Sequence, residues 1–208
     1  MRLVTVSASY GAGGSRIAPA VAERIGVPFL DRAVPARDDA LDEVGEGAAT
    51  EEDVSRGVWA RVLDALATVP DEFGTRAPEL GGDRAVTVRA EAERRLRALA
   101  DAGTGGVVLG WAAALVLPEA VRIRFDGPVA ARIRRGMEIE GVDADTARRR
   151  LERTDEIRRL YWRRLYRQDW RDPDHYHLVL DTTVLDLEAA TALVVAAVNA
   201  IEPVAPTS

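Results

Sequence analysis

Residues 3–25 read LVTVSASYGAGGSRIAPAVAERI, and this stretch decides the fold. Leu3–Ser7 is a short run rich in β-branched residues, which is typical of a buried strand. Glycine-rich residues follow, and an amphipathic stretch from Ile17 to Ile25 then ends at Gly26. The pattern predicts a strand, a glycine loop and a helix in direct succession.

Strands and helices are expected to alternate along the rest of the chain. Strands joined through helices run parallel and are covered on both faces, so the order predicts an α/β fold. The 208 residues, 47% of them apolar, allow one sizeable core. We expect one domain over residues 1–202 and a disordered tail over 203–208. The expected strands are Val27–Leu30, Val107–Leu109, Val121–Phe125 and Leu178–Leu180, and the expected helices are Glu51–Ala67, Ala85–Ala102, Asp143–Tyr166 (one helix or a pair) and Leu187–Ala200.

The composition restricts the chemistry. All 28 basic residues are arginines, so every cationic role falls to a guanidinium group, which binds phosphate through a planar bidentate fork. A GC-rich genome would produce the same bias without a functional demand. There is no cysteine, which excludes disulfides and thiol catalysis. Without an apolar run of about 18 residues or a secretory signal, we expect a cytoplasmic protein that has no membrane partner.

Charge is segregated along the chain. The formal net charge is −6, which argues against a nucleic-acid partner. Residues 38–79 are strongly acidic, whereas residues 132–171 hold thirteen arginines. The basic segment is where an anionic ligand could bind.

The glycine loop is the first candidate site. A loop between the first strand and first helix of a parallel sheet gathers backbone N–H groups at the positive end of a helix dipole, where phosphate binds. Ala8–Ser15 (ASYGAGGS) follows the P-loop pattern, except that Gly14 stands where lysine is usual. The Ser15 hydroxyl could bind Mg²⁺. Such a turn also forms without a ligand, and the glycines alone favour neither interpretation.

Two neighbouring residues bear on this choice. Arg16 favours a ligand, because a cation in the first helical turn opposes the helix dipole by about 0.3–1 kcal/mol unless an anion is bound there. Pro19 lacks an N–H group and is comfortable only in the first turn of a helix. We therefore expect the helix to begin near Ser15 or Arg16.

Several motifs together resemble a known family. They are VTVSASYGAGGSRIAPAVAERIGVPFLDR (4–32), Val107–Leu109 followed by Gly110, VRIRFDGPVAARIRR (121–135) and the arginine-rich stretch from DTARRRLERTDEIRR to the apolar end at residue 193. These resemble the cytidylate kinase-like proteins, a branch of the P-loop nucleoside monophosphate kinases. The resemblance covers residues 3–32 and about 106–195.

The resemblance implies a three-layer P-loop kinase fold with a parallel five-stranded sheet. It places a helical lid at residues 132–172 and the monophosphate-binding part within 33–102, although 33–83 has no confident counterpart. The implied activity is transfer of the ATP γ-phosphoryl group to a CMP-like or dCMP-like acceptor, with ATP and Mg²⁺ as cofactors. Such chemistry depends mostly on positioning and charge neutralisation.

The resemblance also implies residue roles. Arg153 and Arg158 flank Asp155 where lid arginines meet phosphates, and Arg149 lies at the lid base; these four are the expected catalytic residues. Asp31 could contact the monophosphate or only cap the next segment. Asp31, Arg32 and Arg89 are the expected substrate-binding set, and the expected ATP cradle is Tyr10, Gly11, Ala12, Gly13, Gly14, Ser15, Arg16 and Arg132, with Ser15 on Mg²⁺.

Two cations usual in the family are missing. An arginine commonly precedes the glycines, where this chain has Ala8 and Ser9, and Gly-Arg commonly follows the third strand, where it has Gly110 and Trp111. Losing a charge-stabilising group typically costs about 10²-fold or more in rate. Arg16, Arg122 or Arg124 could replace them. Three functions therefore stay open: a kinase, a nucleotide-binding protein without transfer, and an interaction module.

Other features have plainer interpretations. Most arginines of the 145–166 helix are expected on a solvated face with i,i+4 pairs such as Asp155–Arg159. Its aromatic residues could stack on single-stranded nucleic acid, but we expect them to anchor the helix to the core. His175 and His177, two apart, could bind a metal on one face or simply begin a strand. The aromatic residues are Tyr161, Trp162, Tyr166 and Trp170.

Overall fold

One parallel sheet forms the centre of the molecule. The computed structural model describes residues 2–31, 82–110 and 112–201. Five strands pair in the order β2-β3-β1-β4-β5, and every pair is parallel, as the sequence predicts. The strands are β1 (Leu3–Ala8), β2 (Phe29–Asp31), β3 (Gly106–Leu109), β4 (Val121–Asp126) and β5 (Leu178–Asp181).

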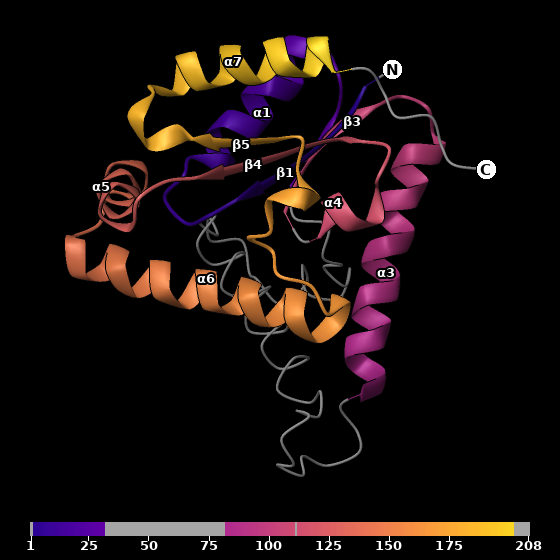
Figure 1. Ribbon diagram of the computed structural model, residues 1–208, viewed down its shortest axis with the longest axis horizontal. Coiled ribbons are helices and arrows are strands. Elements are labelled where there is room, and N and C mark those ends of the chain that lie inside the picture. Colours follow the sequence, from indigo (N-terminus) through magenta and orange to yellow (C-terminus); the bar gives the residue numbers. More distant parts are fainter. Residues whose placement is uncertain (1, 32–81, 111, 202–208) are drawn as a thin grey trace, which may run out of the picture.

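Helices cover both faces of this sheet. The helices α1 and α7 lie side by side on one face, and α6 runs along the opposite side (Figure 1). None of the helices in the described ranges combines the length and apolar content that crossing a bilayer requires. The helices are α1 (Gly14–Ile25), α3 (Gly82–Asp101), α4 (Ala113–Val116), α5 (Val129–Glu140), α6 (Ala144–Tyr166) and α7 (Leu187–Ala200), with short 3₁₀ turns η2 (Pro173–His175) and η3 (Thr182–Val184).

The expected elements agree with the structure within a few residues. The range of α7 is the predicted one, and α6 is one continuous helix, so the helix-pair alternative is wrong. The strands β4 and β5 each extend one residue further than expected, to Asp126 and Asp181. The helix expected over Glu51–Ala67 lies outside the described residues.

The start of α1 differs from the prediction. It begins at Gly14, before the expected Ser15 or Arg16, because Gly13 adopts the left-handed conformation (φ 76°) and serves as the N-cap. Pro19 consequently lies in the second turn rather than the first. A proline there cannot donate to the carbonyl of Ser15, so the helix begins early at the cost of one internal hydrogen bond.

The two sides of the central strands differ in chemistry. Successive side chains of a strand point to opposite faces. Val4 and Val6 of β1 and Ile123 of β4 belong to the apolar core under α1 and α7 and are almost fully buried. Each such side chain contributes about 1.5–3 kcal/mol when buried. Ser7 and Arg124 alternate with them, so the side of the sheet that faces α6 carries buried polar groups.

Aromatic residues fix α6 to the rest of the molecule. Trp162 and Trp170 are each 1% exposed, and they pack with Tyr161 and Tyr176 against the short helix α4. The predicted anchoring role of the aromatic residues is therefore confirmed. Their burial places one face of α6 against the sheet and the glycine loop.

Candidate functional site

The loop between β1 and α1 lies at the carboxyl edge of the sheet, where parallel α/β proteins bind ligands. It turns at two glycines in the left-handed region, Gly11 (φ 72°) and Gly13 (φ 76°). Between them, Ala12 is completely buried. Its carbonyl oxygen accepts a hydrogen bond of 2.7 Å from Thr182 Oγ1, and its amide donates to the carbonyl of Ser9 at 3.1 Å. The loop is thus held from both sides.

The first turn of α1 presents unsatisfied amides. The amides of Arg16 and Ile17 donate to the carbonyl oxygen of Gly13 at 3.0 and 2.9 Å. Within the residues that the structure describes, the amides of Gly13, Gly14 and Ser15 have no hydrogen-bond acceptor. The N-cap has no side chain, and the first turn contains no acidic residue. These three donors, at the positive end of the helix dipole, form the arrangement that binds an anion.

Two loop glycines leave no space for a side chain. A Cβ atom on Gly11 would lie 1.9 Å from the carbonyl oxygen of Arg132, and one on Gly14 would lie 2.4 Å from Ala8 Cβ. Gly14 is the position where the P-loop pattern has lysine. A lysine at position 14 would clash with Ala8 unless Ala8 moved, so the packing around this position requires glycine.

The backbone of Tyr10 is held by side chains from two helices. Its amide donates to Asp155 Oδ1 at 3.2 Å, and its carbonyl oxygen accepts from Arg132 Nη1 at 3.1 Å. Arg132 and Asp155 form an ion pair of 2.8 Å, and they are 3% and 7% exposed. Arg132 Nε also donates to the carbonyl of Gly127 at 3.0 Å. The predicted cradle residue Arg132 and the predicted catalytic residue Asp155 therefore meet at the loop, on its backbone.

The side chain of Tyr10 belongs to the packing between α5 and α6. Its hydroxyl donates to Glu140 Oε2 at 2.7 Å, and its ring contacts the apolar cluster that contains Ile133 and Leu151. A Cβ atom on Gly136 would lie 2.7 Å from the ring. Burial and then the hydrogen bond to Glu140 raise the pKa of the Tyr10 hydroxyl. The Tyr10 side chain therefore packs between the two helices, and only its peptide groups belong to the glycine loop.

A second charged group lies beside the loop at the end of β4. Asp126 Oδ1 accepts from Ser9 Oγ at 2.7 Å and lies 3.6 Å from Arg132 Nε, and its other oxygen accepts from Arg124 Nη2. Arg124 is 4% exposed and stacks 4.7 Å from the ring centre of Trp170. Sequence reasoning named Arg124 as a replacement cation but missed Asp126. The signal for Asp126 was its place at the carboxyl end of a strand.

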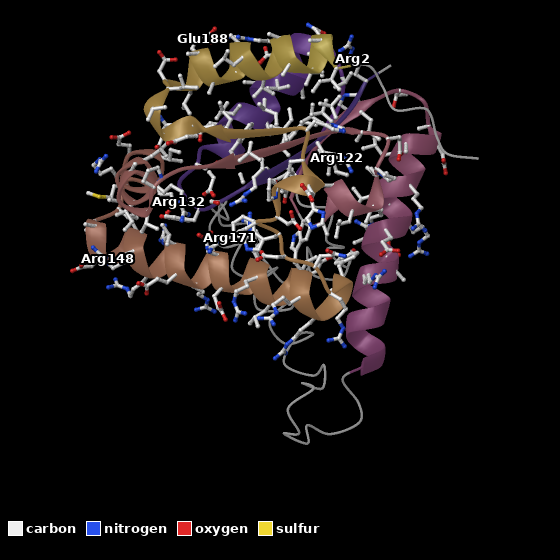
Figure 2. The ribbon with its side chains drawn as sticks, viewed as in Figure 1. Arg2, Arg122, Arg132, Arg148, Arg171 and Glu188 are labelled. Atoms are coloured by element: carbon white, nitrogen blue, oxygen red, sulfur yellow. The ribbon has the colours of Figure 1, made fainter. Side chains whose placement is uncertain are left out.

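Two further guanidinium groups approach the same tryptophan ring. Arg158 and Arg171 lie 5.0 and 5.3 Å from the ring centre of Trp170. Arg171 lies between the sheet and α6, and Arg132 lies between α5 and α6 (Figure 2). Cationic groups therefore concentrate on the side of the loop that faces α6, which favours an anionic ligand there.

The three expected lid arginines face different ways. Arg158 lies on the inner side of α6 and donates to the carbonyl oxygen of Ala8, directly before the loop. Arg149 and Arg153 are exposed, and Arg149 donates to Thr146 Oγ1 at 3.0 Å. With 3.6 residues per turn, Arg149 and Arg153 lie about 180° and 140° around the helix from Arg158. The structure brings Arg158 to the loop and leaves the other two on the outer face of α6.

The two described members of the expected substrate-binding set, Asp31 and Arg89, lie on different elements, β2 and α3. Asp31 is exposed at the end of β2. Arg32 lies outside the described residues. Arg89 in α3 donates to the carbonyl of Leu165 at 2.5 Å and stacks 4.5 Å from the ring centre of Tyr166. Arg89 thus connects α3 to the end of α6.

One expected surface pair is wrong. Asp155 does not pair with Arg159 four residues on, because it points inward to Arg132. Arg159 instead pairs with Glu156 at 2.5 Å on the outer face. Helical spacing predicts only partners on the same helix, so it missed the partner on α5.

The two histidines lie in different surroundings. His175 is in η2 and packs against Trp162, with 5.4 Å between ring centres. His177 Nδ1 accepts from the amide of Arg122 at 3.1 Å, beside β4. In the described ranges, no group of three or more histidine, cysteine or acidic residues is placed to hold a metal ion. Burial and then the charge of Arg122 lower the pKa of His177.

A family model and several solved structures are similar to this chain. An uncharacterized protein from Eubacterium ventriosum ATCC 27560 superposes with a TM-score of 0.63 at 18% identity, over 97% of this chain and 100% of that one. Shikimate kinase from Aquifex aeolicus (TM-score 0.49, 15% identity, 97% and 99% covered) and deoxyadenosine kinase from M. mycoides (0.48, 13%, 96% and 100%) are more distant. The comparison with curated proteins finds no match. The fold is an α/β P-loop kinase fold, and because the model of the cytidylate kinase-like family matches residues 3–184, the chain belongs to that family.

Proposed function

We propose that this protein is a kinase that transfers the γ-phosphoryl group of ATP to a nucleoside monophosphate, with a CMP-like or dCMP-like acceptor. One observation carries the proposal: the amides of Gly13, Gly14 and Ser15 at the carboxyl edge of the sheet have no acceptor among the described residues. Membership of the cytidylate kinase-like family supports a kinase reaction, and the CMP-like or dCMP-like acceptor is the finer part of the proposal.

The proposed ATP site is the loop from Gly11 to Arg16. Three amides and the helix dipole would bind phosphate oxygens. The bound anion would also offset the unfavourable interaction between the helix dipole and the exposed Arg16 side chain in the first turn. Phosphoryl transfer relies on positioning and on groups that stabilise charge in the transition state. The loop supplies such groups from the backbone, which needs no lysine.

Arg158 is the proposed lid arginine that faces the phosphates. Its guanidinium already reaches the last residue of β1, Ala8, through the carbonyl oxygen. The family resemblance places Arg153 at the phosphates as well and Arg149 at the lid base, and it implies a catalytic role for both. Because both lie on the outer face of α6, their contribution requires a different orientation of the helix, and it stays a prediction.

The oxygen groups near the loop fit Mg²⁺, which prefers oxygen ligands and keeps several waters. Ser15 is exposed in the first turn of α1, and the Asp126 side chain, 33% exposed, lies at the same edge of the sheet. Bound Mg²⁺ would neutralise charge on the transferred phosphoryl group. In the proposed site, Ser15 holds the metal and Asp126 remains fixed by Ser9 and Arg124.

A second candidate is a nucleotide-binding protein without transfer activity. It is favoured by one observation: Gly14 packs so closely on Ala8 that the site has no place for the usual lysine. The amide cradle would still bind a polyphosphate. The two candidates therefore share the site and differ in turnover.

An ADP assay on the full chain separates them. ATP and Mg²⁺ are supplied with CMP, dCMP, UMP, AMP or GMP in turn, and melting temperature is measured with ATP alone. The kinase proposal expects ADP with a pyrimidine monophosphate, lost in Arg158→Ala but kept in Arg148→Ala, whose residue is exposed on α6. A raised melting temperature without ADP supports the second candidate. No ADP and no thermal shift contradict both.

A further inference from the structure

We propose that Arg132 and Asp155 are positioning residues that clamp the Tyr10 peptide groups and thereby fix the start of the phosphate cradle to α5 and α6. In this role neither side chain needs to touch a nucleotide. The clamp itself follows from contacts within the chain. Only its effect on nucleotide affinity rests on the proposed function.

The contacts are directed at the backbone from two sides. Asp155, on α6, accepts from the Tyr10 amide at 3.2 Å through Oδ1 and pairs with Arg132 at 2.8 Å through Oδ2. Arg132, on α5, reaches the Tyr10 carbonyl at 3.1 Å and the Gly127 carbonyl at 3.0 Å. Both carboxylate oxygens are used. A buried charge is tolerated when it is paired and hydrogen-bonded. Here Arg132 and Asp155 neutralise each other, and backbone groups form hydrogen bonds with both side chains.

The clamped residue directly precedes the turn that shapes the cradle. Gly11 has φ 72°, so the orientation of the Tyr10–Gly11 peptide sets the direction in which the loop leaves β1. Gly11 also packs against the carbonyl oxygen of Arg132. On the other side of the clamp, Arg158 holds the carbonyl of Ala8. The loop from Ala8 to Gly11 is therefore tied to α5 and α6 at each end.

This arrangement has a functional consequence. A loop that is held in one conformation before the ligand arrives binds it with less loss of conformational entropy. Moving α6 away from the sheet breaks the bond to the Tyr10 amide and the bond to Ala8. The position of α6 and the shape of the cradle are thus coupled, and a change in one is expected to change the other.

The test compares Asp155→Asn with Arg150→Gln. Asparagine keeps the shape of the side chain but removes the charge opposite Arg132. Arg150 pairs with Glu140 at 2.7 Å, and Glu140 also accepts from the Tyr10 hydroxyl. Arg150→Gln therefore removes a charged contact between the same two helices but leaves the bonds of Arg132 and Asp155 to the Tyr10 peptide groups in place, which makes it the matched control. Amide hydrogen exchange reports on the loop, and calorimetric titration with ATP reports on the cradle.

For Asp155→Asn we expect exchange of the Tyr10 amide to accelerate about tenfold or more while α7 stays protected. We also expect the dissociation constant for ATP to rise about tenfold. Arg150→Gln is expected to change neither quantity. If Asp155→Asn leaves the Tyr10 amide protected, or raises exchange equally throughout the molecule with unchanged ATP affinity, the two residues only stabilise packing and the proposal is wrong.

Two provisions keep the test decisive. If Asp155→Asn does not fold, Arg132→Lys keeps the charge but not the fork that reaches two carbonyls, and the same local exchange is expected. A protected Tyr10 amide in that variant would overturn the clamp. If the natural protein does not bind ATP, the proposed function fails, whereas the exchange measurement still decides whether the clamp exists.

Discussion

Gly11 packs directly against the carbonyl oxygen of Arg132, so closely that a Cβ atom on Gly11 would lie 1.9 Å from that oxygen. The contact joins the glycine loop to the first turn of α5, backbone against backbone. Neither partner can yield through a change of rotamer. The loop and α5 can therefore coexist in this arrangement only with glycine at this position.

Gly11→Ala is expected to destabilise the protein by about 3 kcal/mol, from overpacking and from the left-handed φ together. Gly141→Ala is the matched control, since Gly141 has φ 66° but no atom of the described part of the chain within 4 Å of its Cβ position. Its expected cost is about 1–2 kcal/mol, from the left-handed conformation alone. Urea unfolding measures both. Equal losses would show that the contact with Arg132 is not present in solution.

Gly136→Ala is expected to destabilise the protein, although it replaces a glycine inside a helix. Alanine normally stabilises such a position by about 0.5–1 kcal/mol. Here its methyl group would lie 2.7 Å from Tyr10 Cε1, so we expect a loss of about 1–3 kcal/mol. In a Tyr10→Ala background the same substitution should become stabilising. A stabilising effect in the natural background would place the Tyr10 ring elsewhere.

Arg158→Ala is expected to reduce phosphoryl transfer more than Arg153→Ala. Arg158 faces the loop, and loss of a charge-stabilising group there typically costs about 10²-fold or more in rate. Arg153 lies on the outer face of α6. Steady-state assays give kcat and KM for both variants. The reverse order would mean that α6 adopts another orientation in the active enzyme.

His177 makes stability depend on pH. Its pKa is lowered in the folded protein by partial burial and by the charge of Arg122, although much of the side chain stays in contact with solvent, whereas an unfolded histidine titrates near 6.5. The unfolded state therefore binds more protons as pH falls through the window between about 6.5 and the lower folded pKa. The contribution of His177 to the free energy of unfolding is therefore complete above pH 6.5, and it is lost as the pH falls through that window.

The measurement is urea unfolding of the natural protein and of His177→Gln at pH 7.5 and 5.5. Acidification should lower the stability of the natural protein more than that of the variant, and by a small amount because His177 is exposed. An identical pH response in the two proteins would exclude His177 as the titrating group.

Local patterns predicted the fold well because they report on packing against the core. The apolar run of α7 gave its range, Leu187–Ala200, and the short β-branched runs gave four of the strands. Proline at position 19 misled the prediction for α1, because the left-handed turn at Gly13 sets where that helix begins.

The site was harder to predict because its groups meet across the fold. Asp155 finds Arg132, 23 residues earlier, and no helical spacing points to that partner. One signal was available: the buried stripe of α6, with Leu151 and Tyr161, marks the inner face of the helix and places Arg158 near it. The same stripe places Arg153 on the outside, which the family resemblance alone does not reveal.

Binding of a polyphosphate at the first turn of α1 is best examined through the amide resonances of Gly13, Gly14 and Ser15 while ATP and Mg²⁺ are added. Phosphate oxygens that accept from these amides should shift all three resonances saturably and downfield, while Gly26 and Gly141 at distant helix ends stay unchanged. Resonances that remain in place at saturating ATP, or shifts confined to other parts of the chain, would contradict a phosphate site at this helix.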